Sequence, residues 1–471
     1  MINRGMIAAA FVAGLAASTH CAAEGTSGAL LPPTPNVVAP AAPPANDAKP
    51  QIHKTRAQPA SLPKERRPVA TAVRRAPPAV VKAFPPPAGE TRFVRDEILV
   101  EFAPNVAPSA IEVVLRRHRL AELEAVPIAL LGTSLHRWRI PDAREAGNVV
   151  RELGAEPLVA SVQPNYVYGL QQNAGAAAPP PAADAGAPQY ALGKLHVDAA
   201  RALATGDKVL VAVVDTAIDE THPDLAGVVE ARFDAVGGQA AALGHGTSIA
   251  GAIAAHGRIQ GVAPQVRILA VRAFAATEAG PQGTTLAILK GIDWAAQAHA
   301  RIVNMSFAGP QDPAMHRILA AAFDKGIVLV AAAGNAGRNS APLFPAADEK
   351  VLAVTATDAD DKLFENANIG RYVAVAAPGV DVLLPVPDGN YELETGTSVS
   401  AALVSGVAAL VLQLHPSLPP ADLRKLLAAT AKPLGAGGQD NEFGAGLVDA
   451  FRALSADGVQ KGSAPAPAAT Q

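Results

Sequence analysis

Three short segments, far apart in the chain, each carry one side chain of the kind that acyl transfer needs. Asp215 follows an apolar run, His245 lies between two glycines, and Ser398 precedes a run of small residues. A serine hydroxyl becomes a nucleophile when a histidine accepts its proton, and a buried carboxylate orients that histidine and stabilises its charged form. The order Asp, His, Ser is one of three unrelated chain orders in which such triads occur. The spacing therefore predicts covalent catalysis with Ser398 as the nucleophile.

The local surroundings of these residues suit those roles. Asp215 ends an apolar strand, and ligands of parallel sheets bind beyond the carboxyl ends of the strands. Ser398 opens a predicted helix over 399–414, where free backbone N–H groups and the helix dipole stabilise negative charge on a nearby carbonyl. Asn335 follows another apolar strand and could donate its amide to the same oxygen. Taken singly, Asp215 or Ser398 could serve only as a helix cap, so the combination carries the prediction.

Composition limits the classes of protein to consider. The 471 residues have room for two or three domains, and 49% hydrophobic against 17% charged residues supports a sizeable core. The net charge is −3 and no basic stripe runs through the globular part, so nucleic acid is not an expected partner. No stretch after the N-terminus reaches the roughly 18 continuous apolar residues of a spanning helix, so no transmembrane segment is expected.

Residues 1–23 have the pattern of an export signal. Arg4 gives a positive start, residues 6–17 form an apolar run, and small residues at 21–23 suit cleavage. The chain is therefore expected to be exported, secreted or periplasmic. Cys21 is the only cysteine, so no disulfide is expected in the mature protein. Two alternatives stay open, a buried N-terminal helix and lipidation at Cys21, although residues 18–20 make a poor lipobox.

Low-complexity segments divide the rest of the chain. Residues 24–90 hold 15 of the 41 prolines and predict an extended linker, either a solvated spacer or a contact with an anionic envelope surface. Residues 171–188 predict a second linker, and 456–471 a disordered tail. Between the linkers, 91–170 predicts a small α+β domain of the split-βαβ, ferredoxin-like kind. Its expected elements are strands at 97–102, 135–140 and 159–168, a helix at 108–120, and a helix capped by Asp142 that runs through Leu153.

The segment 189–455 predicts an α/β domain. Continuous apolar runs alternate with helical segments, which is typical of a parallel sheet with helices on both faces. The expected strands are 209–214, 268–274, 302–305, 327–333, 351–355 and 373–376, with helices at 284–298 and 315–325 among them.

Together these segments resemble the subtilisin-like serine peptidase (subtilase) family, over residues 189–454. Four further motifs agree, at 222–225 (HPDL), 261–264 (GVAP), 344–346 (FPA) and 376–379 (AAPG). The resemblance implies a serine endopeptidase acting on polypeptides, with Asp215 as the orienting acid, His245 as the general base, Ser398 as the nucleophile and Asn335 in the oxyanion hole. It also implies that Ser306, Phe307 and Ala308 pair with the substrate backbone, and that Ala333 and Gly334 line the primary specificity pocket.

By the same resemblance, residues 91–170 look like a subtilisin propeptide. Such a domain assists folding and acts as an intramolecular inhibitor, so the chain would be a zymogen. Its last segment, 165–170, would enter the site in the manner of a product. The processing bond would then lie between Tyr168 and Tyr190.

Several departures from the family pattern leave an alternative open, a catalytically inactive subtilase fold that binds peptides or envelope partners. Ala217 stands where the family has a glycine, at a cost of about 1 kcal/mol if that position needs a positive φ. Residues 399–402 (VSAA) replace the usual sequence after the serine, and Ala308 replaces a glycine. The short loop 255–260 lacks carboxylates, so the family's strong calcium site is expected to be missing, with Asp224 left for a weaker cation site. No other cofactor is expected.

Overall fold

The computed structural model describes residues 82–170, 189–238, 244–435 and 437–456. The predicted export signal at 1–23, the linker at 171–188 and, apart from Ala456, the tail at 456–471 lie outside the described residues. So does nearly all of the predicted linker at 24–90.

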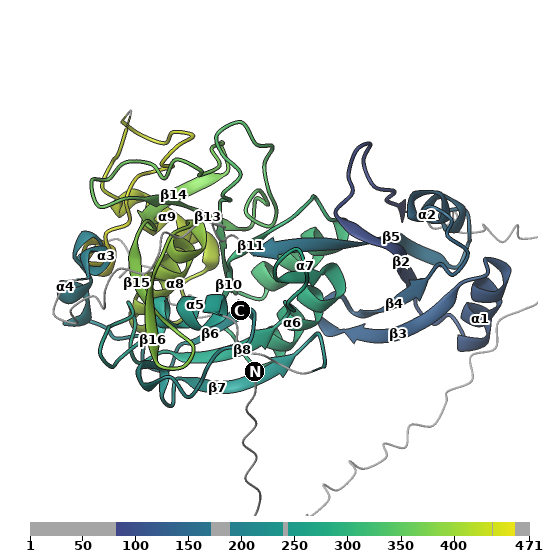
Figure 1. The fold of residues 1–471 in the computed structure, drawn as a ribbon, viewed down its shortest axis with the longest axis horizontal. Helices are drawn as coiled ribbons and strands as arrows, with labels where there is room; N and C mark the ends of the chain where they lie inside the picture. Colours follow the sequence, from purple (N-terminus) through teal and green to yellow (C-terminus); the bar gives the residue numbers. More distant parts are fainter. Residues whose placement is uncertain (1–81, 171–188, 239–243, 436, 457–471) are drawn as a thin grey trace, which may run out of the picture. The chain divides into compact units, whose positions relative to one another are not determined.

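A seven-stranded parallel sheet forms the larger part of the structure (Figure 1). The α/β fold class predicted from the sequence is confirmed, and every predicted strand of this sheet is present within two residues of its expected ends. The strand of this sheet missed by the sequence analysis is β7, because its half-buried and exposed residues alternate instead of forming an apolar run. In spatial order the strands are β14 (Val373–Pro378), β13 (Leu352–Thr357), β12 (Val328–Ala332), β10 (Ile302–Met305), β6 (Leu210–Asp215), β8 (Arg267–Arg272) and β7 (Val229–Asp234).

Helices cover both faces of the parallel sheet. Along β6, Val211 and Val213 pack into one core, whereas Ala212 and Val214 pack into the other. Successive strand residues point to opposite faces, so a sheet buried on both sides needs apolar residues at every position. Helices α5 (Gly244–Ala254) and α8 (Thr397–Leu414) cover one face, and α6 (Thr285–Gln297) and α7 (Pro313–Asp324) the other.

Shorter elements complete this part of the chain. A β-hairpin of β15 (Val382–Val386) and β16 (Asn390–Glu394) leads into α8 and packs on α5. The remaining elements are α3 (Tyr190–Lys194), α4 (Val197–Arg201), η2 (Pro223–Leu225), α9 (Pro420–Thr430) and α10 (Ala450–Ser455).

The segment before residue 171 forms a second, mixed sheet in the order β1-β5-β2-β4-β3. Its helices pack on one face of the sheet. Their side chains Val114, Val149 and Leu153 form one buried core with Trp138 and Ile98 of the strands. The elements are β1 (Lys82–Ala83), β2 (Phe93–Phe102), α1 (Pro108–Arg117), β3 (Ala121–Ile128), η1 (Ala129–Leu131), β4 (Thr133–Arg139), α2 (Ala146–Leu153) and β5 (Val159–Leu170).

Three details of this second sheet correct the sequence analysis. The predicted linker ends before residue 90, because Lys82–Ala83 pairs with β5. Strand β3 was missed, since seven of its eight residues are exposed or half-buried and they form no apolar run. Asp142 does not cap α2, because its carboxylate accepts hydrogen bonds from the Arg144 guanidinium and the helix begins only at Ala146.

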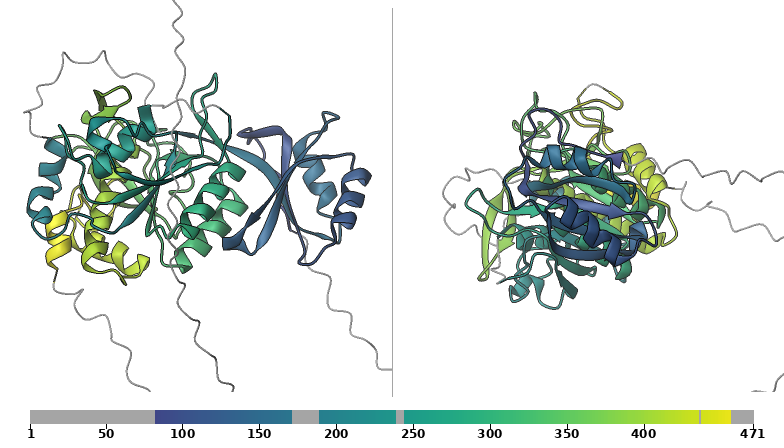
Figure 2. Two further views of the ribbon diagram at one scale, coloured as in Figure 1. Left: turned by 90° about the horizontal axis from the view of Figure 1, so that it is seen from below. Right: turned by 90° about the vertical axis from the view of Figure 1, so that its right-hand side faces the viewer.

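Strand β5 is longer than predicted and joins the two sheets (Figures 1 and 2). Its end pairs in antiparallel fashion with β9 (Gln282–Thr284) on one side and β11 (Phe307–Ala308) on the other. In this register Leu170 lies opposite Phe307, and Gly169 opposite Ala308. The last residues of β5 therefore form the middle strand between β9 and β11, which both belong to the larger part of the structure.

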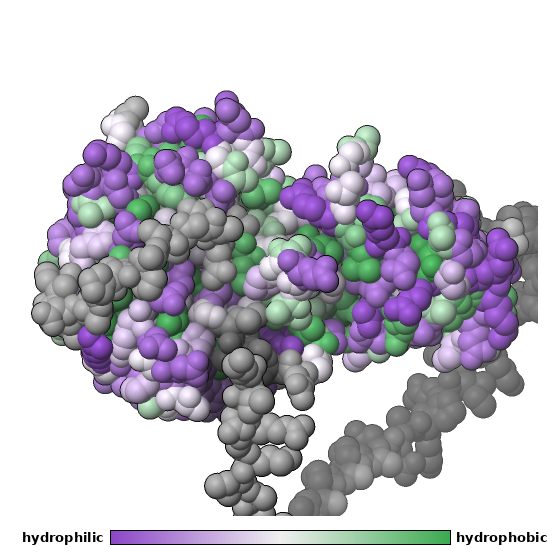
Figure 3. Space-filling model, viewed as in Figure 1, coloured by the Kyte–Doolittle hydropathy of each residue, from purple (hydrophilic) through white to green (hydrophobic). Residues whose placement is uncertain are grey.

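Polar and apolar residues are interspersed over the face of the described residues in Figure 3. Within the described part of the chain, one helix is long and apolar enough to cross a membrane, namely α8. The apolar window of this helix is 89% buried inside the protein, which is typical of a core helix.

Candidate active site

Asp215 and His245 meet at the carboxyl end of the parallel sheet. The imidazole Nδ1 lies 2.8 Å and 2.9 Å from the two carboxylate oxygens, and both side chains are buried. Asp215 ends β6, and His245 stands in the first turn of α5. Between them Gly246 packs so closely that a Cβ there would lie 2.7 Å from the Thr216 carbonyl oxygen. The glycine after the histidine therefore allows α5 to approach the end of β6.

Ser398 stands in the first turn of α8, which packs against α5 and the strands β10 and β12. Its backbone carbonyl accepts a hydrogen bond from Ser306 Oγ at 3.1 Å. Ser306 in turn accepts a hydrogen bond from Asn304 Nδ2, at 2.9 Å. The residue directly after β10 thus holds the start of α8 in place.

Asn335 is brought to the same helix start. Its Oδ1 accepts hydrogen bonds from the backbone N–H of Thr397, at 3.1 Å, and from Thr397 Oγ1, at 2.7 Å. Thr397 Oγ1 also lies 3.1 Å from the amide of Gly334, whose φ of +117° suits glycine. These contacts fix the oxygen of the Asn335 amide toward the start of α8.

The residues predicted to bind the substrate lie on and beside β11 and directly after β12. Phe307 and Ala308 form β11 and pair with β5, while Ser306 holds Ser398. Ala333 and Gly334 follow β12 and are buried, and the Ala333 carbonyl accepts a hydrogen bond from the Tyr372 hydroxyl at 3.0 Å. The sequence analysis did not include Thr397 or Tyr372 among the residues that hold the site together.

The electrostatics of the imidazole follow from its two acidic neighbours. Burial opposes the charged form of His245, but the Asp215 carboxylate and, more weakly, Glu394 outweigh it and raise the pKa of His245 above its ordinary value. Burial also raises the pKa of Glu394, which lies at the end of β16 and accepts a hydrogen bond from Ser248 Oγ at 3.4 Å. The other imidazole nitrogen, Nε2, is buried and makes no hydrogen bond to any of the described residues. A buried acceptor without a partner costs free energy of folding, and this nitrogen is the one that a general base uses to accept a proton.

The substitution at Ala217 carries no backbone strain. Ala217 is not among the described non-glycine residues with positive φ, so the cost of about 1 kcal/mol considered for this position does not arise. The departure from the family glycine therefore leaves the Asp215 strand end undisturbed.

The short loop 255–260 is held by protein groups. The Asp224 carboxylate accepts hydrogen bonds from the backbone N–H groups of Arg258, at 2.7 Å, and Ile259, at 2.9 Å. The Gln189 side chain pairs with the backbone of Gln260 through two hydrogen bonds, of 2.8 and 2.9 Å. Since amide hydrogens occupy both oxygens of Asp224, this donor set does not fit a strongly bound calcium ion.

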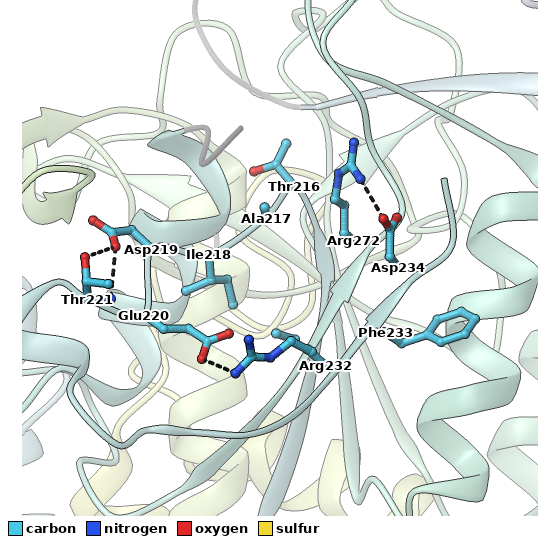
Figure 4. A pocket seen from close by; sticks show the side chains of 11 residues that line it. Thr216, Ala217, Ile218, Asp219, Glu220, Thr221, Arg232, Phe233, Asp234 and Arg272 are labelled. Atoms are coloured by element: carbon cyan, nitrogen blue, oxygen red, sulfur yellow. Dashed lines mark hydrogen bonds and ion pairs between the residues drawn. The ribbon is translucent and has the colours of Figure 1, made fainter. Parts of the chain in front are cut away.

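A cavity of about 440 Å³ lies beside the loop that follows Asp215 (Figure 4). Two ion pairs line it, Glu220 with Arg232 at 2.8 Å and Asp234 with Arg272 at 2.7 Å. None of the triad residues is among the described residues that line this cavity. It is a neighbour of the site and is distinct from the slot between β9 and β11.

Comparison with known proteins agrees with this geometry. The sequence model of the subtilase family matches residues 206–446. Subtilisin DY of Bacillus licheniformis is 35% identical over 254 residues, which are 52% of this chain and 90% of that protein. A thermophilic serine proteinase of Bacillus sp. (strain AK1) is 32% identical over 328 residues, 68% of this chain and 78% of that protein.

A solved structure shares the fold over a longer stretch. Fervidolysin from Fervidobacterium pennivorans, described as a keratinolytic enzyme related to subtilisin, superposes with a TM-score of 0.67 and 25% sequence identity. The match covers 80% of this chain and 63% of the fervidolysin chain, so it spans less than two thirds of that protein. From the family match and the curated relatives, the chain belongs to the subtilase family of serine peptidases.

Proposed function

We propose that this subtilase is an exported endopeptidase, secreted or periplasmic, which is made as a zymogen and hydrolyses peptide bonds through an acyl-enzyme. Ser398 Oγ attacks the peptide carbonyl as His245 Nε2 takes its proton. The imidazolium then passes that proton to the leaving amine, and a water molecule hydrolyses the ester by the same route. The observation that carries this proposal is the buried contact of 2.8 Å between His245 Nδ1 and Asp215, at the sheet edge where α8 begins.

The oxyanion of each tetrahedral intermediate is held by the Asn335 side-chain N–H₂ and the Ser398 backbone N–H. The contacts of Asn335 Oδ1 with Thr397 support this role, because they fix the orientation of the amide before substrate arrives.

Asn335→Ala is expected to lower kcat by about 10²–10³-fold with little change in KM, since the lost hydrogen bond forms mainly in the transition state; the figure is the one known for the same donor in subtilisin. Steady-state kinetics on a peptide substrate measure it. Asn390→Ala, at an exposed asparagine of β16, is the control and should behave as the parent. An Asn335→Ala enzyme with parental kcat would remove Asn335 from the oxyanion hole.

The inhibitor role of residues 91–170 is supported by the way β5 lies between β9 and β11. A polypeptide substrate would add itself to these segments as a strand, and β5 already takes that place. Polar contacts secure the small sheet on α6 and α7. The Leu130 amide lies 2.7 Å from Asp293 Oδ1, and Glu101 pairs with Arg317 at 2.6 Å. We therefore propose that processing cuts the chain within 171–188 and that β5 then leaves the slot to substrates.

The acidic neighbour of His245 gives a prediction about pH. Glu394→Gln removes a negative charge that helps to raise the pKa of His245, so the neutral base should persist to lower pH. We expect the acid limb of the profile of kcat/KM against pH to move to lower pH. Glu349→Gln, at an exposed position outside β16, should leave that limb in place. Identical profiles for Glu394→Gln and the parent would show that Glu394 does not influence the general base.

The hydrogen bonds between Asp224 and the 255–260 loop give a prediction about stability. Asp224→Asn replaces a buried carboxylate that accepts two backbone hydrogen bonds, so the free energy of unfolding should fall by about 1.5–3 kcal/mol. Urea unfolding in a Ser398→Ala background avoids self-digestion, and Asp207→Asn at an exposed site is the control. We also propose that these hydrogen bonds take the place of a tightly bound calcium ion, so EDTA should not shift the midpoint of urea unfolding. A large shift with EDTA would contradict this.

The proposed activity is tested by expressing the full chain with its own leader. We expect mass spectrometry to find a mature form that begins within 171–189, and that form should cleave a denatured fluorescent protein at internal bonds. A correctly folded, processed protein that cleaves no polypeptide would refute the proposal.

A further inference from the structure

Tyr168 of β5 fills a closed pocket in the larger part of the structure. Its side chain is fully buried, and its ring packs edge-to-face on Phe307 at 5.8 Å. Gly309 lies so close to the ring that a Cβ there would stand 2.3 Å from Tyr168 Cδ1. The pocket therefore fits an aromatic ring because residue 309 has no side chain.

A buried carboxylate lies at the end of this pocket. The Tyr168 hydroxyl donates to Asp312 Oδ2 at 3.2 Å. Burial, together with the nearby Asp312 charge, raises the pKa of Tyr168 far above its ordinary value, so the hydroxyl keeps its proton and remains a donor. Asp312 itself is only 2% exposed. An apolar ring alone would not need such an acceptor.

Three of the hydrogen bonds that position Asp312 come from outside β5. Its Oδ1 accepts from the backbone N–H groups of Ala314 and Met315, at 2.9 and 3.1 Å, as the N-cap of α7. Its Oδ2 accepts from Thr285 Oγ1 at 2.6 Å. These partners belong to the larger part of the chain and hold the carboxylate when β5 leaves. Strand β5 itself contributes two further hydrogen bonds, from the Tyr168 hydroxyl to Oδ2 at 3.2 Å and from Gln163 Nε2 to Oδ1 at 2.7 Å, so its departure opens one position on each oxygen.

We propose that this pocket selects tyrosine side chains in substrates, with Asp312 as the residue that distinguishes tyrosine from phenylalanine. The inference rests on the proposed function, in which a substrate strand replaces β5. Gly309 and Phe307 set the shape of the pocket, and Asp312 accepts the phenolic hydroxyl. Phenylalanine would fill the same space but leave that acceptor without its partner.

The register of β5 gives the substrate position. Leu170 lies opposite Phe307, so a substrate strand in the same register places its next residue opposite Ser306, beside the Ser398 carbonyl. Counting that residue as the first before the scissile bond, the one in the place of Tyr168 is the fourth. The preference for tyrosine should therefore appear four residues before the cleaved bond.

The test uses the mature enzyme and quenched fluorescent peptides that differ only at that fourth residue, which is tyrosine, phenylalanine or alanine. Since a hydrogen bond to a charged group contributes about 1.5–3 kcal/mol, we expect kcat/KM for tyrosine to exceed that for phenylalanine by about tenfold to hundredfold. Moving the tyrosine to the third or fifth position should abolish this advantage. Equal rates for the tyrosine and phenylalanine peptides would overturn the proposal.

Two variants separate the polar contact from the shape of the pocket. Asp312→Asn keeps a good N-cap residue for α7, and it should bring the ratio of tyrosine to phenylalanine close to one. Gly309→Ala should reduce kcat/KM for both aromatic peptides relative to the alanine peptide, because the new Cβ takes ring space. A ratio that persists in Asp312→Asn would show that Asp312 is not the acceptor. If the parent cleaves no peptide of the series, the proposed function fails as well, whereas cleavage without preference refutes the tyrosine pocket alone.

Discussion

Ser398→Ala is expected to give a stable, full-length precursor with no detectable peptidase activity. The variant lacks the hydroxyl oxygen that we propose forms the acyl-enzyme, so kcat should fall by about 10⁶-fold, the loss known for subtilisin without its serine. Processing should stop too, because we propose that the chain cuts itself. Gel mass, intact-mass spectrometry and peptide hydrolysis measure both effects.

Ser400→Ala is the matched control for this experiment. Ser400 lies in the same turn region of α8 and is equally buried, but its hydroxyl donates to the Ala377 carbonyl, at 3.0 Å. It should be processed and active. If Ser398→Ala were still processed in a host without the parent enzyme, self-cleavage would be wrong. If it hydrolysed peptides at the parental rate, Ser398 would not be the nucleophile.

Asp215→Asn should produce the second largest loss, about 10⁴-fold in kcat, similar to subtilisin without its aspartate. The asparagine cannot stabilise the imidazolium, and its N–H₂ group favours the wrong tautomer of His245. The loss of the carboxylate also removes the main group that raises the pKa of His245. The remaining activity should therefore show an acid limb at lower pH than that of the parent.

A strand-end aspartate on the neighbouring part of the sheet offers the control. Asp234 ends β7 as Asp215 ends β6, but it pairs with Arg272, and within the described part of the chain no hydrogen bond or ion pair joins it to His245. Asp234→Asn should keep kcat within a few-fold of the parent. A similar loss in both variants would mean that the effect comes from the sheet edge in general and not from the His245 partner.

The strongest sequence predictions rest on local signals. The apolar run before Asp215 predicted where β6 ends, and the structure confirms this end within one residue. The same holds for β10, whose bounds were predicted without error. In each case the residues that form the element also carry the pattern, because a strand buried on both faces needs an unbroken apolar run.

The missed features depend on distant parts of the chain. Strand β9 has only three residues and forms because β5 lies beside it, so residues 282–284 alone carry no strand pattern. Glu394 acts on His245 through the hairpin that precedes α8, and Asp312 faces Tyr168 across 144 positions of sequence. Such contacts are set by tertiary packing and leave no periodic signal. The short helix α2 was predicted with the wrong cap, because the Asp142 carboxylate accepts a hydrogen bond from the Arg144 guanidinium and not from the backbone of α2.

Labelling of the mature protein with a serine-directed phosphonate tests the central claim most directly. The imidazole of His245, held by Asp215, should make one serine reactive among all serines of the chain. We expect a single adduct per molecule, located on Ser398 by peptide mass spectrometry, and no adduct in His245→Ala. An active, processed protein without an adduct, or with the adduct on another residue, would contradict the account.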